Sequence, residues 1–385
     1  MSLKGDPAWP LVLCGVKVAL LTDCYLPRLG GIEVQMHDLG RHLVAEGHEV
    51  HAFTATRGAD GTRHGQEVID GVQVHRLAIP LPGDLPVNPL APRELRSVLG
   101  DFDVAHVAMG VVSPFAMDST RVALGLGVPT AVTWHCVQDR FRFVVQAAGY
   151  VRRWSRRGAA LSAVSSVAAA PLVGLSTTPI AVLPNGISVA DWAPSGELRV
   201  PPGGVVEVVS AMRLATRKRP VELVAAVGAA RSELTGRGVD LRLTILGDGP
   251  LRSRVLTEGA RYGDGWLTLP GRVTREELRA RYLDSDLYVA PARLEAFGIA
   301  ALEARTVGLP VVAPAMSGVS EFVTDGVNGV LTGPSTSELA AGIARLAGDT
   351  ALLREITVTN QTSAPACDWP DVVRAAVAEY ERAGA

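Results

Sequence analysis

The sequence has little of what would mark a membrane-spanning, extracellular or nucleic-acid-binding protein. No apolar run approaches the roughly 20 residues that a membrane-spanning helix needs. The formal net charge is −2, whereas nucleic-acid binders carry a basic excess. The four cysteines lie far apart with no CxxC pair, which predicts neither a structural zinc site nor a disulfide framework. The start MSLKGDPAWP lacks the order of a signal peptide, so we expect residues 1–10 to be a leader or cloning remnant and the protein to be cytoplasmic.

Lysine is also scarce. Of the 37 lysine and arginine residues only three are lysines, namely Lys4, Lys17 and Lys218. A genome rich in G and C, which favours arginine codons, explains the general scarcity and suggests a bacterial source. Lys218 is the only lysine after residue 17, so its place in the loop MRLATRKRP (212–220) favours a specific role.

The chain alternates between strand and helix patterns in two series. Its 385 residues predict two domains, and 48% hydrophobic with 20% charged residues is a globular composition. Apolar, β-branched runs predict buried parallel strands at 16–23, 49–55, 104–108, 130–134, 161–166 and 180–184, then at 205–211, 241–247, 267–271, 287–292, 310–315 and 329–333. Helical patterns between them include 31–47, 220–234, 249–262 and 274–283.

This alternation predicts an α/β protein of two Rossmann-like, doubly wound parallel-sheet domains that face each other. A segment rich in proline, glycine and serine at 184–204 is the predicted linker. We therefore expect a first domain at 1–185, a second at 186–366 and a final amphipathic helix at 367–385. Ligands of such sheets bind beyond the carboxyl ends of the strands, so the cleft between the domains is the expected site.

Two features follow strands of the first domain. Gly30 and Gly31 open a helix, where glycines let the backbone approach a ligand and the helix N-terminus favours an anion; a plain turn is the other interpretation. His135 follows the strand TAVTW. A lone histidine is more often structural, but the position at a carboxyl end favours a functional role.

Three loops of the second domain carry further candidates. Arg213 and Lys218 precede a helix, and their charges suit phosphate oxygens, although a solvated basic loop is the alternative. Gly247 begins the tight turn GDGP, which is not a dinucleotide fingerprint. Backbone groups at Arg272 and Val273 follow another strand, where they can border a flat base.

The most informative stretch is EAFGIAALE (295–303). Glu295 lies in a loop, and a helix begins near Phe297, Gly298 and Ile299. Glu303 lies eight positions after Glu295, close to two helical periods of 3.6, and therefore near the same side. Carboxylates accept hydrogen bonds from sugar hydroxyls and the helix N-terminus suits a diphosphate, so the stretch predicts sugar–phosphate binding. A helix N-terminal acid plus a surface acid is the alternative.

Together these residues resemble the retaining glycosyltransferases of family 4, with the GT-B fold, over nearly the whole chain. The motifs are E-x7-E with an internal FG, the pattern from Arg213-Leu214 to Lys218, the GDGP turn, PNGI at the linker, the GG loop, and GLPVVAPAMSGVSEFVTDGVNGVL at 308–331. Ser188, Arg219, Ala108 and the turn Met316–Gly318 depart from the family pattern. The final helix crosses back onto the first domain in such enzymes.

The resemblance implies a role for each residue. Arg213 and Lys218 would hold the donor diphosphate, Glu303 the ribose, and Glu295 the donor sugar. Amides near Phe297, Gly298 and Ile299 would surround sugar and phosphate, and Arg272, Val273 and Gly247 would border the nucleotide. Gly30 and Gly31 would approach the phosphate, and His135 would lie between the donor sugar and the acceptor.

The implied reaction transfers a hexose or N-acetylhexosamine to a hydroxyl acceptor with retention, through same-face attack. Negative charge grows on the leaving diphosphate, and fixed cations stabilise it. The sequences DFD (101–103) and DSD (284–286) match a metal-binding DxD pattern, but both precede strands, away from the ligand side. We therefore expect no metal and no cofactor besides the nucleotide-sugar donor, with UDP as the first expectation and GDP the second.

Several alternatives stay open at this point. A sugar-nucleotide 2-epimerase shares the architecture, and a non-catalytic partner protein would keep the fold without turnover. The acceptor can be a lipid-linked sugar, an inositol phosphate or a secondary-metabolite aglycone such as an aminocyclitol. The basic segment 140–158 is either a solvated helix or a peripheral membrane contact. The oligomeric state is not indicated.

Overall fold

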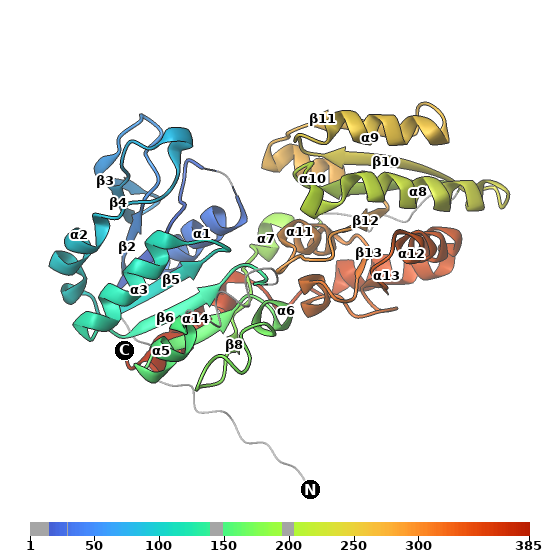
Figure 1. Ribbon diagram of the computed structural model, residues 1–385. Helices are drawn as coiled ribbons and strands as arrows, with labels where there is room; N and C mark the ends of the chain where they lie inside the picture. Colours follow the sequence, from blue (N-terminus) through green and yellow to red (C-terminus); the bar gives the residue numbers. More distant parts are fainter. Residues whose placement is uncertain (1–14, 29, 139–148, 195–203) are drawn as a thin grey trace, which may run out of the picture.

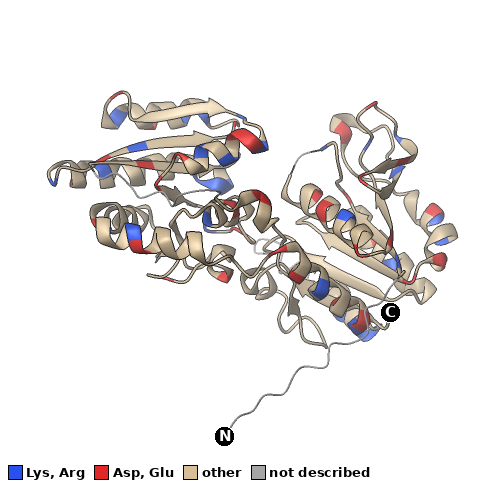
Figure 2. Cartoon of the chain, turned by 180° about the vertical axis from the view of Figure 1, so that it is seen from behind, with Lys and Arg blue, Asp and Glu red and all other residues tan. Residues whose placement is uncertain are grey.

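Two α/β domains stand side by side in the computed structural model, which describes residues 15–28, 30–138, 149–194 and 204–385 (Figure 1). The first contains an eight-stranded sheet of order β3-β4-β2-β1-β5-β6-β7-β8. The second contains a six-stranded sheet of order β11-β10-β9-β12-β13-β14. Acidic and basic residues are mixed over the helices of both domains (Figure 2), in keeping with the small net charge.

The first sheet is parallel except for the antiparallel pair β3–β4. Its strands are β1 (Lys17–Thr22), β2 (Glu49–Thr54), β3 (His64–Ile69), β4 (Val72–Leu77), β5 (Val104–Met109), β6 (Thr130–Trp134), β7 (Ala160–Ala163) and β8 (Ala181–Val182). Its helices are α1 (Gly31–Ala45), α2 (Ala91–Val98), α3 (Pro114–Leu126), α5 (Tyr150–Arg156) and α6 (Ser166–Ala169), with short 3-10 turns η1 (Pro82–Asp84) and η2 (Leu99–Asp101).

The second sheet is parallel throughout. Its strands are β9 (Val205–Ala211), β10 (Asp240–Leu246), β11 (Leu267–Gly271), β12 (Leu287–Val289), β13 (Val311–Pro314) and β14 (Gly329–Thr332). Its helices are α8 (Pro220–Thr235), α9 (Arg252–Gly259), α10 (Arg275–Leu283), α11 (Ile299–Val307), α12 (Thr336–Gly348) and α13 (Thr350–Thr362), with the 3-10 turns η3 (Thr216–Lys218), η4 (Ala260–Tyr262) and η5 (Gly318–Glu321).

The predicted fold class is confirmed, since each predicted strand is present, with ends shifted by a few residues. The sequence analysis missed the pair β3–β4 because β3 is an exposed edge strand without a buried apolar run. The buried strands β1, β5 and β6 carry such runs and were recognisable from them.

The last helix, α14 (Trp369–Ala383), packs on α1 and on strands β5, β6 and β7 of the first domain. The hydroxyl of Tyr380 lies 2.9 Å from Nδ1 of the buried His106. In the linker, Asp368 accepts a hydrogen bond from the backbone of Val189 at 3.1 Å, at the start of α7 (Val189–Trp192). The Asp368 carboxylate, which also caps the start of α14, therefore links the starts of α7 and α14. The boundary at 185/186 stays a prediction; it falls between Val182, where β8 ends, and the start of β9.

The basic segment at 140–158 falls partly outside the described residues, which resume at 149. In its described part, helix α5 buries Tyr150, Val151 and Trp154 in the core of the first domain. These apolar side chains therefore face the protein interior. Across the described residues, no helix is both long and apolar enough to span a bilayer.

Candidate active site

A cavity of about 690 Å³ lies between the domains, beyond the carboxyl ends of strands from both sheets. The first domain and linker line it with Arg28, Gly31, Ile32, Glu33, His135 and Asn185. The second domain lines it with residues 210–213, Arg217, Lys218, Tyr288, residues 290–292 and residues 295–301. The cavity is therefore composite, and neither domain forms it alone.

The structure brings most of the predicted site residues together here. Those that line the cavity are Gly31, His135, Arg213, Lys218, Glu295, Phe297, Gly298 and Ile299. Five others are not among its lining residues, namely Gly30, Gly247, Arg272, Val273 and Glu303. Their predicted contacts with a nucleotide stay predictions.

The loop after β9 carries the cations. Arg213 is exposed and has no ion pair with another described residue. Lys218 ends the turn η3 and forms an ion pair with Glu295, the side chain predicted to face the donor sugar. The lysine and the carboxylate therefore neutralise each other within the cavity.

Arg219, where the family favours glycine, has a left-handed backbone with φ of 55°. This conformation is the one that favours glycine. The arginine side chain is buried instead and donates to the carbonyls of Pro291 at 3.0 Å and Pro334 at 3.3 Å and to the Thr336 hydroxyl at 3.2 Å. Arg219 thus links the loop before α8 to the segments after β12 and β14.

Two glycines determine the shape of the loop that leads into α11. Gly298 has φ of 95°, and a Cβ there would meet Val319 at 2.8 Å. A Cβ at Gly318 would meet the carbonyl of Ala296 at 2.1 Å, and the Gly318 N–H donates to the carbonyl of Glu295 at 2.8 Å. The turn Met316–Gly318, which departs from the family pattern, therefore retains the glycine that this contact requires. The loop aims the first turn of α11 at the cavity.

Glu303 lies in the second turn of α11 and is partly buried. Burial raises the pKa of its carboxyl to about 8, and the charge of Arg275 only partly offsets this effect. At neutral pH the carboxyl is therefore mostly protonated, so it can both donate and accept hydrogen bonds.

His135 follows β6, and its backbone N–H donates to the carbonyl of Met109 at 2.9 Å. Its Nε2 is buried with no hydrogen-bond partner among the described residues. Burial lowers the pKa of the imidazole to about 4, although a side-chain hydrogen bond with Asn185 raises it in part. His135 is therefore neutral at pH 7, and it lines the cavity with its Nε2 buried and unpartnered among the described residues.

The predicted glycines have distinct roles in packing. A Cβ at Gly31 would lie 3.5 Å from Cδ1 of Ile299, so the two domains approach each other at this point. A Cβ at Gly30 would meet the Glu33 carboxylate at 2.4 Å. Gly247 has φ of 128°, and a Cβ there would meet the carbonyl of Met212 at 2.0 Å. Gly247 thus lets the GDGP turn pack against the loop that carries Arg213.

The sequence analysis did not single out several lining residues, namely Arg28, Asn185, Ser210, Arg217 and Tyr288. Arg28 and Arg217 stand within motifs that were recognised, in the GG loop and the RKR run. Asn185 stands in PNGI, at the linker, where its position after a strand was the available signal. Tyr288 lies inside β12 and looked like an ordinary core residue.

Both DxD sequences lie at the amino ends of strands, as predicted. Asp103 accepts a hydrogen bond from the backbone of Lys17 at 2.7 Å, just before β5. Asp286 accepts one from the backbone of Glu207 at 2.8 Å, just before β12. Within the described residues, no three histidine, cysteine, aspartate or glutamate side chains gather in a way that would bind a metal ion.

In comparisons with known proteins, the chain is similar to glycosyltransferases. Residues 29–191 match the family described as Glycosyltransferase Family 4, and residues 200–361 match Glycosyl transferases group 1. A D-inositol 3-phosphate glycosyltransferase from Pseudarthrobacter chlorophenolicus is 30% identical over 78% of each chain. A GDP-mannose-dependent alpha-mannosyltransferase from Mycobacterium tuberculosis is 28% identical over 96% of this chain and 97% of the relative.

A solved structure shows the same fold. HepE from Anabaena, in complex with UDP and glucose, superposes with a TM-score of 0.71 at 18% identity. The superposition covers 94% of this chain and 98% of HepE. The two-domain arrangement is therefore shared over nearly the full length of both proteins.

Proposed function

Because the chain belongs to the group 1 glycosyltransferases of family 4, which have the GT-B fold, we propose that it moves a hexose or N-acetylhexosamine from a nucleoside-diphosphate sugar to a hydroxyl acceptor with retention. One observation carries the proposal. A single cavity joins Arg213, Lys218, Glu295 and the start of α11 on one side with Gly31 and His135 on the other.

The leaving diphosphate is assigned to the second-domain side of the cavity. Arg213 and Lys218 lie in the loop before α8, and the N-terminus of α11 presents backbone N–H groups that the helix itself leaves unpaired. Such fixed charges stabilise a transition state best where its own charge develops. These cations support transfer without a metal ion.

The ion pair between Lys218 and Glu295 fits this assignment. Both side chains are partly exposed, so the pair is weak enough for a diphosphate to compete for the lysine. Once Lys218 turns to a phosphate oxygen, the Glu295 carboxylate becomes free to accept hydrogen bonds from the hydroxyls of the donor sugar. Binding of the donor would therefore replace one internal contact by two with the ligand.

The ribose and base are assigned to the region beyond the cavity, along α11. Glu303 would hold the ribose hydroxyls, with Arg272, Val273 and Gly247 near the base. A protonated Glu303 can donate one hydrogen bond and accept another, which suits paired hydroxyls.

His135 is assigned to the donor sugar and the attacking hydroxyl. Its neutral imidazole lines the cavity and has an unpartnered Nε2, so we expect it to hydrogen-bond a hydroxyl without adding charge near an oxocarbenium-like transition state. Same-face attack by the acceptor hydroxyl, assisted by the leaving phosphate, retains the anomeric configuration without an enzyme nucleophile.

The names of the relatives guide the choice of donor and acceptor. UDP was the first expectation, whereas the relative from M. tuberculosis is named for GDP-mannose. GDP-mannose therefore joins the UDP-sugars as the first donors to test, and D-inositol 3-phosphate is the first acceptor. A role in glycoconjugate or secondary-metabolite biosynthesis, and the cytoplasmic location, stay predictions.

The test is a transfer assay with each donor and acceptor, with and without EDTA, followed by NMR of the product. The proposal expects a product whose anomeric configuration equals that of the donor, formed equally with EDTA. Inversion would contradict retention, and loss of activity with EDTA restored by manganese would contradict the metal-independent reaction. Conversion of a donor alone into its 2-epimer would show an epimerase, and donor binding without turnover on any acceptor would favour a non-catalytic partner.

A further inference from the structure

A second cavity, of about 360 Å³, lies within the first domain. It opens beside the segments that follow β1, β2 and β4, and therefore at the same edge of the sheet as the active-site cavity. Arg28, Arg57 and Arg63 line it together with the carboxylate Asp84. We name this cavity the arginine pocket.

The arginine pocket adjoins the active-site cavity, because Arg28 lines both. A molecule whose hydroxyl group lies beside His135 can thus extend past Arg28 into the pocket. The pocket is lined by first-domain residues. The proposed diphosphate site is lined by the second domain, so the pocket lies on the acceptor side of the reaction.

Its charged lining is mainly cationic. Nη2 of Arg57 lies 3.0 Å from Oδ2 of Asp84, with each side chain about half exposed. Nε of Arg28 lies 3.5 Å from the Glu33 carboxylate. Arg63 is exposed and has no ion pair with another described residue. Exposed ion pairs contribute little, so an incoming anion can compete for all three guanidinium groups.

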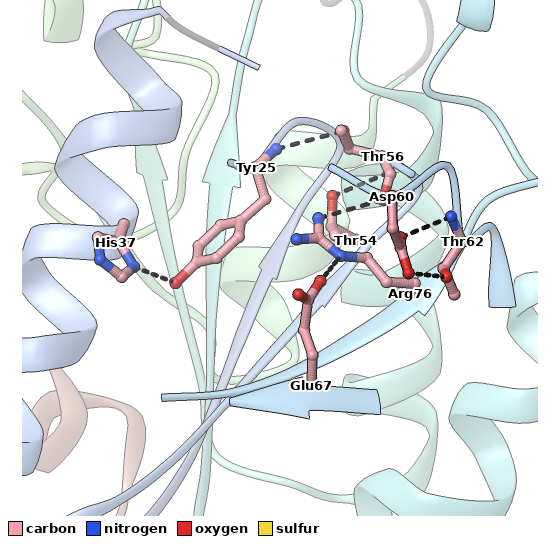
Figure 3. Close-up of polar contacts among 8 residues, drawn as sticks. All are labelled: Tyr25, His37, Thr54, Thr56, Asp60, Thr62, Glu67 and Arg76. Atoms are coloured by element: carbon pink, nitrogen blue, oxygen red, sulfur yellow. Dashed lines mark hydrogen bonds and ion pairs between the residues drawn. The ribbon is translucent and has the colours of Figure 1, made fainter. Parts of the chain in front are cut away.

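Hydrogen bonds from Arg76 and Tyr25 to Thr56 hold the loop that carries Arg57 (Figure 3). Arg76 on β4 is only 1% exposed, and its Nε donates to the Glu67 carboxylate at 2.7 Å. Its Nη1 donates to the carbonyl of Thr56 at 3.2 Å, and the Thr56 hydroxyl accepts from the backbone of Tyr25 at 3.2 Å. The pocket therefore has a fixed floor, in which the charge of the buried Arg76 is compensated by Glu67.

We propose that the arginine pocket binds a phosphate group of the acceptor, and thereby selects phosphorylated acceptors over neutral or cationic ones. The proposal rests on the proposed function, since it assigns the acceptor of that reaction. Guanidinium groups bind phosphate oxygens in a bidentate, directional manner, and three of them converge on the pocket. A cationic acceptor, such as an aminocyclitol, is disfavoured by the same charges.

The test compares acceptors that differ in one phosphate: glucose 6-phosphate with glucose, myo-inositol 1-phosphate with myo-inositol, and phosphatidylinositol micelles as the lipid form. Affinity is measured by calorimetry with the nucleoside diphosphate present, and KM where transfer occurs. We expect at least one phosphorylated probe to bind about 10-fold or more tightly than its neutral partner. Preference for the micelles would assign the phosphate to a lipid headgroup, and preference for the soluble probes to a free sugar or cyclitol phosphate.

The variants Arg57→Ala and Arg63→Ala each remove one exposed guanidinium, so the fold is expected to persist. Each variant should lower the affinity for the phosphorylated probe by about 10-fold, because a charge-assisted hydrogen bond is lost. The affinity for the donor should stay unchanged. Asp84→Asn keeps the side-chain shape, tolerates the positive φ and removes the competing carboxylate, so it should tighten binding by about two- to fivefold. Arg121→Ala, which removes an exposed arginine paired with Asp118 on α3, is the control.

Equal affinity for phosphorylated and neutral probes, or variants that bind the phosphorylated probe like the wild type, would overturn the proposal. Failure of the proposed function looks different. In that case the wild-type protein would bind no nucleotide sugar, or would transfer sugar to no acceptor, whereas failure of the pocket alone leaves both donor binding and transfer intact.

Discussion

The two halves of the active-site cavity differ in charge. The second domain contributes the cations Arg213 and Lys218, the carboxylate Glu295 and a helix N-terminus. The first domain contributes, close to the domain contact, the small Gly31 and the neutral His135. The guanidinium groups of Arg57 and Arg63 lie in the arginine pocket, whereas Arg28 lines both cavities and is paired there with Glu33.

This difference suggests that the two sides of the cleft act on different groups, the leaving diphosphate and the attacking hydroxyl. A leaving diphosphate needs fixed positive charge at the second-domain side. An attacking hydroxyl needs a neutral hydrogen-bond partner, because an extra cation beside an oxocarbenium-like transition state would repel it. In the proposed reaction, this arrangement would separate the charge that grows on the donor phosphate from the guanidinium groups that are proposed to bind the acceptor.

Lys218→Ala, in the charged half of the cavity, should have the largest effect on turnover. Loss of one preorganised cation at the leaving group should lower kcat by about 10²–10³-fold at saturating donor. Lys17→Ala, which removes a lysine paired with Glu49 at the far end of β1, is the control and should keep wild-type kcat. Wild-type turnover in the Lys218 variant would remove the leaving-group role.

His135→Ala tests the neutral half. The loss of one hydrogen bond to a hydroxyl should lower kcat/KM by about 10-fold, and His135→Gln should recover part of it. Because the pKa of His135 lies at about 4, the imidazole stays neutral from pH 5 to 8, and the pH profile should show no step near 6.5 from this residue. A step near 6.5 that disappears in His135→Gln would show that the imidazole is charged in the reaction.

Glu303→Gln tests whether a carboxyl of α11, beyond the charged half of the cavity, is neutral in the folded protein. Its pKa of about 8 in the folded protein lies above the ordinary glutamate value of 4.5, so the folded protein holds an extra proton between these values and loses stability as pH rises through them. The variant escapes this loss. The difference in melting temperature, variant minus wild type, should therefore be smallest at pH 5 and grow up to pH 9. A difference that does not change with pH would refute the raised pKa.

The sequence predicted the parallel core well, because buried parallel strands are continuous apolar runs. The edge strand β3 has no such run, and nothing in the sequence indicates that Arg76 on β4 is buried. The arginine pocket could not be predicted from the sequence either. It is assembled from loops that are far apart in the chain and carry no shared motif.

Within the site, motifs located the loops but not the partners of each side chain. EAFGIAALE indicated a sugar–phosphate site, yet the ion pair of Glu295 with Lys218 joins residues 77 positions apart. Arg219 departs from the family pattern, and the structure compensates through hydrogen bonds of its buried side chain to the carbonyls of Pro291 and Pro334. Such compensations depend on tertiary contacts that a single sequence does not display.

The most direct test of the central claim is a thermal-shift measurement with GDP-mannose and UDP-, ADP- and dTDP-sugars, without added metal, on the wild type and on Lys218→Ala. A ligand that binds only the folded state raises the melting temperature. The account predicts that one donor raises it for the wild type and that this shift largely disappears in the variant. No shift with any donor, or an equal shift in both proteins, would contradict diphosphate binding by the second-domain loop.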